Sequence, residues 1–125
     1  MIIEVRTTAR RQMVDITGRI AAALEASDNG LCHVFVPHTT AAVVINESAD
    51  PDVPRDLTAA YEAMVPAIPF AHAEGNSDAH LMATLLGSSV TVPVEQGRMC
   101  LGTWQGIFFV ELDGPRSRKV RVTRI

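Results

Sequence analysis

The sequence predicts an α+β fold: a mainly antiparallel β-sheet or sandwich with about three inserted helices. Short apolar runs rich in β-branched residues occur near both ends of the chain, and three segments with helical spacing lie unevenly between them. The regular strand–helix alternation of a parallel α/β fold is absent. With 125 residues, no internal repeat and no linker, the chain is expected to form one domain, residues 1–125.

The first third of the chain predicts strand, helix and two further strands. Rough alternation of apolar and polar residues predicts a strand over residues 2–8. A helix follows, with Thr17 as its N-cap candidate and Ile20 on its apolar face. Two apolar runs, 31–37 and 41–45, then predict buried strands.

The middle of the chain predicts two helices and the end predicts strands. Apolar residues recur at helical spacing over 53–65, with Pro54 in the first turn. A polar loop over 70–78 precedes a second helix, 78–86, whose N-cap candidates are Ser77 and Asp78 and which Gly87 closes. The expected strands that follow are 90–94, 99–101, 106–112 and 119–125, with a hairpin-like turn at 95–98.

Composition excludes several classes of protein. The net charge of −3 argues against a nucleic-acid binder driven by bulk electrostatics. No apolar stretch approaches the roughly 20 residues that cross a bilayer, and the N-terminus lacks a signal-peptide pattern, so we expect no membrane association and a cytoplasmic location. Cys32 and Cys100 both lie in apolar runs and are expected to be buried free thiols.

The first candidate site lies where two apolar strands end in polar residues. The strand at 31–37 is followed by His38 and Thr39, and the strand at 41–45 is followed by Asn46 and Glu47. If the two strands pair through a tight connection, His38 and Glu47 lie at opposite ends, whereas a kink at His38 lets them converge. Ordinary turn chemistry, with hydroxyls and amides satisfying backbone groups, explains the same residues without a site.

The second candidate is a run of nine residues, 72–80, that contains two histidines and two carboxylates. Neutral imidazole is a common metal ligand, and a carboxylate often completes the set. His72 lies in the loop and His80 in the first turn of the helix, so the loop can bring both rings to one ion. Asn76 and Gly75 precede that helix, whose N-terminal N–H groups suit a phosphate. A solvated loop with a helix cap is the alternative.

Two further segments carry polar groups that suit a ligand. Thr103, Trp104 and Gln105 lie between two glycines, and Trp104 is either a ligand-stacking ring or an anchor in a core or interface. Near the C-terminus, Arg116 and Arg118 are placed to reach an anion, although charged residues that protect an edge strand are the more common explanation.

These residues, in this order and spacing, resemble the YjbQ family, which is also labelled the secondary thiamine-phosphate synthase family. The matching segments cover nearly the whole chain and are His38–Ala42, Asn46–Glu47, Asp50–Pro51, His72 with Glu74–Gly75, His80–Leu81, Leu86–Gly87 and Gly102–Gly106. The resemblance implies a compact α+β fold, a homotrimer and a weak ability to couple a pyrimidine methyl diphosphate to a thiazole phosphate with release of pyrophosphate.

The residues are chemically suited to that class of reaction, because a diphosphate leaving group needs cations and N–H groups around it. We expect His38, His72 and His80 to bind a divalent ion, with Glu47 or Glu74 as ligand or base. A three-histidine set suits Zn²⁺ or another transition metal, whereas Mg²⁺ prefers oxygen ligands, and the sequence leaves the choice between Zn²⁺ and Mg²⁺ open. The residues expected to contact phosphate or substrate are Thr39, Asn46, Asn76, Thr103, Gln105 and Arg116. A non-catalytic trimer that binds a metal or a phosphorylated metabolite, or a metal-dependent hydrolase, are the alternatives.

Overall fold

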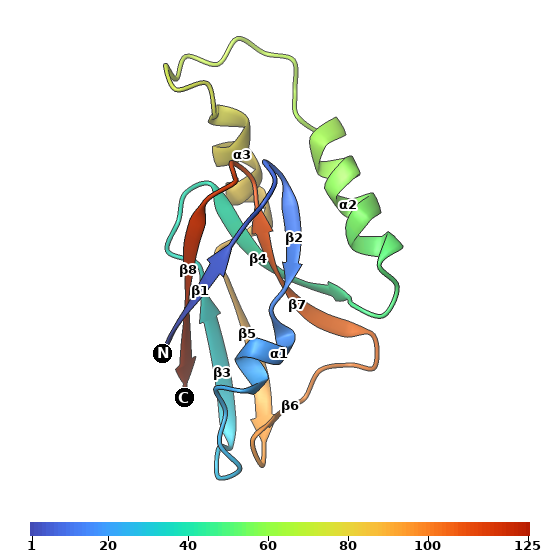
Figure 1. Ribbon diagram of the computed structural model, residues 1–125, viewed down its shortest axis with the longest axis vertical. Coiled ribbons are helices and arrows are strands. Elements are labelled where there is room, and N and C mark those ends of the chain that lie inside the picture. Colours follow the sequence, from blue (N-terminus) through green and yellow to red (C-terminus); the bar gives the residue numbers. More distant parts are fainter.

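A computed structural model describes residues 1–125, which form two packed β-sheets with two helices against the outer side of the smaller sheet (Figure 1). The strand and helix types expected from the sequence are present. In chain order the elements are β1 (Ile2–Arg6), β2 (Gln12–Asp15), α1 (Thr17–Ala21), β3 (Gly30–Phe35), β4 (Ala41–Glu47), α2 (Asp52–Ala63), α3 (Ser77–Leu86), β5 (Ser89–Glu95), β6 (Arg98–Met99), β7 (Gln105–Glu111) and β8 (Ser117–Arg124).

Both sheets are antiparallel throughout. The larger has the order β1-β8-β3-β5-β6 and the smaller the order β2-β7-β4. The consecutive strands β3 and β4 belong to different sheets, so residues 36–40 cross from one sheet to the other. This crossover lies near α3, at the end of the sandwich that is uppermost in Figure 1.

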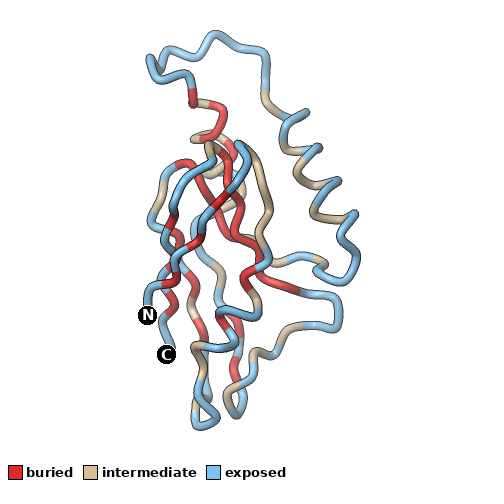
Figure 2. The backbone as a smooth tube through the Cα atoms, viewed as in Figure 1, coloured by how far each residue is buried: buried red, intermediate tan, exposed pale blue.

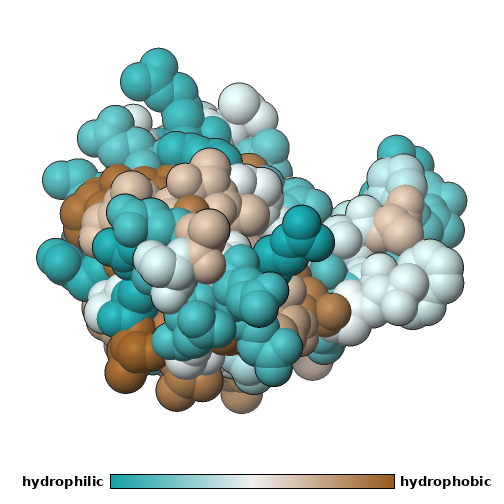
Figure 3. Space-filling view, turned by 90° about the horizontal axis from the view of Figure 1, so that it is seen from below, coloured by the Kyte–Doolittle hydropathy of each residue, from teal (hydrophilic) through white to brown (hydrophobic).

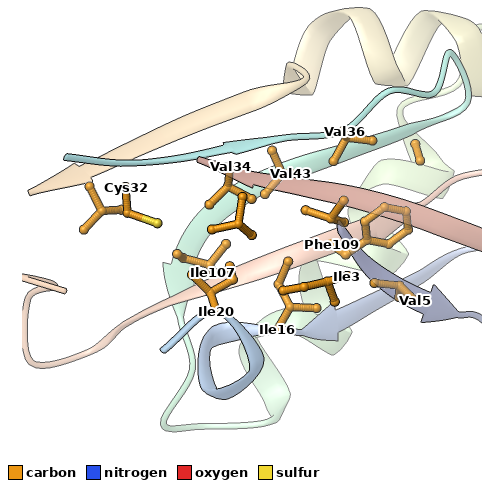
Figure 4. Packing of buried hydrophobic residues seen from close by; sticks show 14 of the residues in the cluster. Ile3, Val5, Ile16, Ile20, Cys32, Val34, Val36, Val43, Ile107 and Phe109 are labelled. Carbon is orange, nitrogen blue, oxygen red and sulfur yellow. The ribbon is translucent and has the colours of Figure 1, made fainter. Parts of the chain in front are cut away.

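The main core lies between the two sheets, because every strand turns alternate residues inward. On β8, Val120 and Val122 are buried while Lys119 and Arg121 are exposed, as the sequence predicted. Phe109 and Ile107 of β7 fill the centre, and α1 closes one side with Ile20 (Figure 4).

The outer face of the smaller sheet is covered by α3. Ala79 and Met82 of this helix pack on Ala42, Val110 and Leu112 in a second, smaller cluster. By contrast, α2 has no fully buried residue, and residues 66–75 between the two helices are exposed throughout (Figure 2). The segment that carries His72 is therefore fixed mainly through the helices at its two ends.

Three details differ from the sequence expectations. Thr17 is the first residue of α1 rather than its cap, because Asp15 accepts the Thr17 backbone N–H at 2.9 Å and the Thr17 hydroxyl bonds to β7. The N-cap of α3 is Asn76 rather than Ser77 or Asp78, since the Asp78 carboxylate is paired with arginines. Cys32 is a buried free thiol as expected, but Cys100 is exposed because β6 ends at Met99.

The surface mixes polar side chains with separate hydrophobic ones. Seen from below, brown hydrophobic atoms show in several places between hydrophilic groups (Figure 3). The exposed hydrophobic side chains include Leu31, Phe35 and Trp104, the last of which is 62% exposed. None of the three helices has the length and apolar character that crossing a bilayer requires.

Candidate functional site

A polar hollow lies where the β3–β4 crossover, the start of α3 and the start of β8 meet. Its volume is about 460 Å³. We call it the arginine hollow, and its lining residues are Pro37, His38, Thr39, Thr40, His72, Glu74, Asn76, His80, Arg116 and Arg118. Three stretches that are far apart in the sequence thus contribute side chains to one space, and nearly all of those side chains are polar or charged.

His38 is held in a defined protonation state by β8. The backbone N–H of Lys119 donates to His38 Nε2 at 2.9 Å, a bond that requires a lone pair on that nitrogen. Burial lowers the pKa of His38, and the nearby Arg118 guanidinium lowers it further. The neutral ring therefore carries its proton on Nδ1, which makes His38 a hydrogen-bond donor.

His72 and His80 lie next to each other, as the length of the loop between them allows. Their ring centroids are 5.5 Å apart, with one ring edge directed at the face of the other. Asn76 lies between them in the sequence and is buried, and its Nδ2 donates to Asp113 at 2.9 Å. Its Oδ1 atom is also buried but has no hydrogen-bond partner, so this end of α3 retains an unused acceptor.

Arg118 forms the floor of the hollow and is fixed by a buried ion pair. Its Nε donates to Glu111 at 2.9 Å, and its Nη2 donates to the Thr40 hydroxyl at 2.9 Å. Glu111 is fully buried and also accepts the Thr7 hydroxyl at 2.7 Å. Burial alone would raise the pKa of Glu111, but the bonds from Arg118 and Thr7 outweigh burial and hold the pKa below its usual value. The side-chain hydrogen bonds of Arg118 all run through Nε and Nη2, and Nη1 makes none within the chain.

Arg116 stands at the open side of the hollow. Its side chain is 52% exposed and bonds to Asp113 through Nη2 at 2.9 Å. Burial opposes ionisation of Asp113, yet hydrogen bonds from Asn76 and Arg116 keep the pKa of that carboxyl below its usual value. Asp113 therefore orients both Asn76 and Arg116 toward the same region.

The histidines do not form a ready metal site within the chain. No three His, Cys, Asp or Glu side chains lie close enough together to hold one ion. His72 and His80 are adjacent, but the Nε2 lone pair of His38 is already used by Lys119. The predicted three-histidine ligand set is thus reduced to two adjacent rings with Glu74 in the same wall, and metal binding stays a prediction.

The other candidate residues lie at the far end of β4. The register pairs Ala41 with Glu111 at the end near the hollow, and Glu47 with Gln105 at the opposite end. Six residue steps of strand separate Ala41 from Glu47, or about 20 Å. Of the two arrangements that the sequence left open, His38 and Glu47 are separated rather than convergent within the chain, because β4 carries the chain from the crossover beside His38 to its far end at Glu47.

Asn46, Thr103 and Gln105 share that distant end and do not line the arginine hollow. Asn46 Oδ1 accepts the backbone N–H of Glu47, and Gln105 Oε1 accepts that of Gly102 at 2.8 Å. These two side chains therefore satisfy backbone N–H groups close to them in the sequence, the role that the alternative interpretation of Asn46 predicted.

Glu111 is the residue of the site region that the sequence interpretation missed. Its signal was present: it is a carboxylate in the otherwise apolar run 107–112. A carboxylate in a buried strand requires a buried cation, and Arg118 is the cation on the valine face of β8.

The fold and the hollow define a class: a two-sheet α+β protein with a histidine- and arginine-lined hollow at the crossover between its sheets. A family model described as "UPF0047 protein YjbQ-like" matches residues 1–125. The chain belongs to this YjbQ/UPF0047 family.

Relatives and solved structures agree with this assignment. The UPF0047 protein YugU of Bacillus subtilis is 43% identical over 120 residues, covering 93% of this chain and 91% of the relative. A UPF0047 protein of Methanocaldococcus jannaschii is 45% identical over 122 residues, covering 95% and 88%. A crystal structure of an uncharacterised YjbQ/UPF0047 family protein from Clostridium acetobutylicum has a TM-score of 0.94 at 45% identity, covering 100% of this chain and 99% of that chain. A YbjQ-like protein of unknown function from Sulfolobus solfataricus has a TM-score of 0.86 at 37% identity, covering 98% and 92%.

Proposed function

We propose that the protein binds a small phosphorylated metabolite, with the phosphate in the arginine hollow. The observation that carries this proposal is the convergence of Arg116, Arg118 and His38 from separate segments on one polar space. Arg guanidinium groups suit phosphate oxygens because they present several N–H donors in a planar array.

Hydrogen-bond donors are available there without breaking existing bonds. Arg118 makes its hydrogen bonds through Nε and Nη2, which leaves Nη1 as a donor, and the neutral His38 ring carries its proton on Nδ1. The Thr39 hydroxyl and the exposed Arg116 side chain add further donors. Because Glu111 and Asp113 already neutralise both arginines, binding relies on directed hydrogen bonds more than on net positive charge.

The reaction implied by the family resemblance uses the same groups. In the coupling of a pyrimidine methyl diphosphate to a thiazole phosphate, the arginines would stabilise the departing pyrophosphate and His80 would act as an acid–base group. We propose this as the catalytic form of the function, with hydrolysis of a phosphate ester and non-catalytic binding as the alternatives. Incubating the purified protein with both substrates and measuring pyrophosphate release distinguishes coupling from binding alone.

A divalent ion fits the hollow in part. His72 and His80 provide two adjacent imidazoles, ligands that suit Zn²⁺ better than Mg²⁺, and Glu74 lines the same hollow without completing a three-residue set. A bound ion would supply positive charge to a phosphate oxygen, and His80 would then be a ligand in place of the acid–base group. Metal analysis of protein purified without a tag or chelator, compared with His80→Ala, tests this: near-stoichiometric metal that the variant loses supports it, and no metal in either refutes it.

We further propose that the chain self-associates, as the resemblance to a homotrimeric family implies. The exposed Trp104, with Thr103 and Gln105 beside it, forms a surface separate from the arginine hollow and suits an interface. Sedimentation equilibrium measures the assembly directly, and a monomer at all concentrations rules it out.

The binding proposal is tested by calorimetric titration with inorganic phosphate. Replacing Arg116 by Gln removes a charged donor whose bond contributes about 1.5–3 kcal/mol, so affinity falls by about 10-fold or more. Arg121→Gln is the matched control, because Arg121 lies on β8, the strand that begins directly after Arg116, but is exposed on the outer face of the larger sheet. Equal affinity in wild type and Arg116→Gln, or no binding in wild type, contradicts the proposal.

A further inference from the structure

A groove separate from the arginine hollow lies between α2 and β2, which are neighbours in Figure 1. We call it the α2 groove. Met13 of β2 and Pro54 and Ala59 of α2 give it apolar walls, and two charged side chains, Arg11 and Glu62, line it as well. None of the residues that line the α2 groove also lines the arginine hollow, so the two are distinct places on the molecule.

Arg11 is a buried cation with an incomplete set of hydrogen bonds. Its side chain is only 6% exposed, and its Nη2 donates to Asp78. Its Nε and Nη1 atoms are shielded from water and yet have no hydrogen-bond partner. A buried guanidinium normally has its N–H groups satisfied, because an unpaired buried donor costs free energy. The α2 groove is therefore lined by a cation that lacks an acceptor.

Glu62 supplies Arg11 with a counter-charge but not with a hydrogen bond. Asp78 pairs with Arg10 at 3.1 Å as well as with Arg11, so one carboxylate faces two guanidinium groups and one positive charge is left unmatched. The Glu62 carboxylate lies beside Arg11 Nε and matches that charge, although Nε donates no hydrogen bond to it. The Glu62 side chain is 62% exposed and belongs to a helix without a buried residue, so it is free to turn into solvent.

We propose that the α2 groove binds an organic monocarboxylate. The ligand's carboxylate takes the place of Glu62 and accepts hydrogen bonds from the Arg11 guanidinium, while its apolar part contacts Met13, Pro54 and Ala59. The exchange conserves charge, because one carboxylate replaces another beside the same cation. A phosphate dianion is disfavoured, because it would bring a second negative charge close to Asp78.

The first test compares benzoate with benzyl alcohol, a probe of similar shape without the charge, by titration monitored through backbone amide NMR shifts. Wild type is expected to bind benzoate saturably at about millimolar concentration, with shifts in residues 11–13 and 58–62, and to bind benzyl alcohol at least 5-fold more weakly. Ala59→Trp fills the groove from an exposed position and abolishes benzoate binding. Ala60→Trp, the exposed neighbour outside the groove, is the matched control and retains it.

The second test measures the exchange with Glu62. Glu62→Gln removes the competing carboxylate, so benzoate binds at least 3-fold more tightly than to wild type, a gain that a merely structural Glu62 does not predict. Asp56→Asn makes the same change in net charge on α2 but outside the groove. It is the matched control and changes benzoate affinity less than 2-fold, because solvent and salt screen an exposed charge.

Three results overturn the inference: no saturable benzoate binding in wild type, equal binding of the two probes, or no gain in Glu62→Gln. Benzoate binding that survives Ala59→Trp, or that inorganic phosphate displaces, also overturns it, since the probe then lies elsewhere. Should Ala59→Trp fail to fold by circular dichroism, the comparison of Glu62→Gln with Asp56→Asn decides alone. The inference does not rest on the proposed function, whose phosphate titration depends on Arg116, so either claim can fail without the other.

Discussion

The buried Glu111–Arg118 pair makes a strong prediction about stability. Glu111 is fully buried and the Arg118 side chain is 6% exposed, so replacing Glu111 with Gln leaves a guanidinium in the core without its counter-charge. Removing one partner of a buried pair costs about 3–5 kcal/mol. A domain of this size has a total stability of about 5–15 kcal/mol, so the variant loses a large share of it.

Urea denaturation at pH 7, followed by far-UV circular dichroism, measures this loss. Trp104 fluorescence is a poor probe, because that side chain is 62% exposed in the folded state. Glu4→Gln on the exposed face of β1 is the control and changes stability by less than about 0.5 kcal/mol. A loss below about 1 kcal/mol for Glu111→Gln refutes the reasoning, since it shows that Arg118 is solvated or paired elsewhere.

The same pair sets a pH dependence. The folded-state pKa of Glu111 is lowered, so the unfolded chain binds this proton more tightly than the folded chain does. The stabilisation is therefore complete above the ordinary value of about 4.5 and is lost as the pH falls through the folded-state pKa. Glu111→Gln removes this contribution, so its stability curve is flatter than that of wild type over the acidic range.

Three further predictions follow from packing, backbone geometry and titration. Phe109→Ala empties the centre of the core and costs about 3–5 kcal/mol in urea denaturation, and a cost below 1 kcal/mol contradicts the described packing. Gly97→Ala destabilises more than Gly75→Ala by at least about 1 kcal/mol: both have positive φ, but a Cβ on Gly97 meets the Glu25 carbonyl oxygen at 2.5 Å, whereas one on Gly75 meets nothing. His38 titrates below 6.5 by NMR, so its protonation destabilises the fold as the pH falls, and a midpoint above 6.5 refutes its described environment.

The fold was largely predictable because hydrophobic periodicity records which face of each element is buried. The expected helices 53–65 and 78–86 correspond to α2 and α3 within two residues at each end, and the alternation in β8 identified its buried valines. The expectations missed β2, residues 12–15, because Gln12 and Asp15 give it no clear alternation and it is only partly buried. Such a short strand forms through pairing with β7, a long-range contact that local sequence does not encode.

The site was predictable only where its residues are close in sequence. His72 and His80 lie on one loop and helix start, so their proximity follows from a short chain length. His38, Arg116 and Arg118 join His72 and His80 in the hollow only because of the crossover between the sheets and the pairing of β8 with β1 and β3. The same register sends Glu47 to the other end of β4, which no local pattern indicates.

The residues of the arginine hollow and those at the far end of β4 are well separated, which leads to a last prediction, for Trp104→Ala. Trp104 lies beside Thr103 and Gln105, near the end of β4 that is about 20 Å of strand from the arginine hollow. A small ligand bound in the arginine hollow therefore does not contact Trp104 of the same chain. Because its side chain is mostly exposed in the single chain, its loss is expected to change monomer stability by less than about 1 kcal/mol.

If the Trp104 surface is an interface, the variant dissociates in sedimentation equilibrium while each chain still binds inorganic phosphate through Arg116 and Arg118. Leu85→Ala, another exposed hydrophobic side chain, is the control and leaves assembly unchanged. A Trp104→Ala variant that assembles normally but binds phosphate 10-fold more weakly contradicts the separation. That result places Trp104 against the ligand, which requires a second copy of the chain to bring it to the hollow.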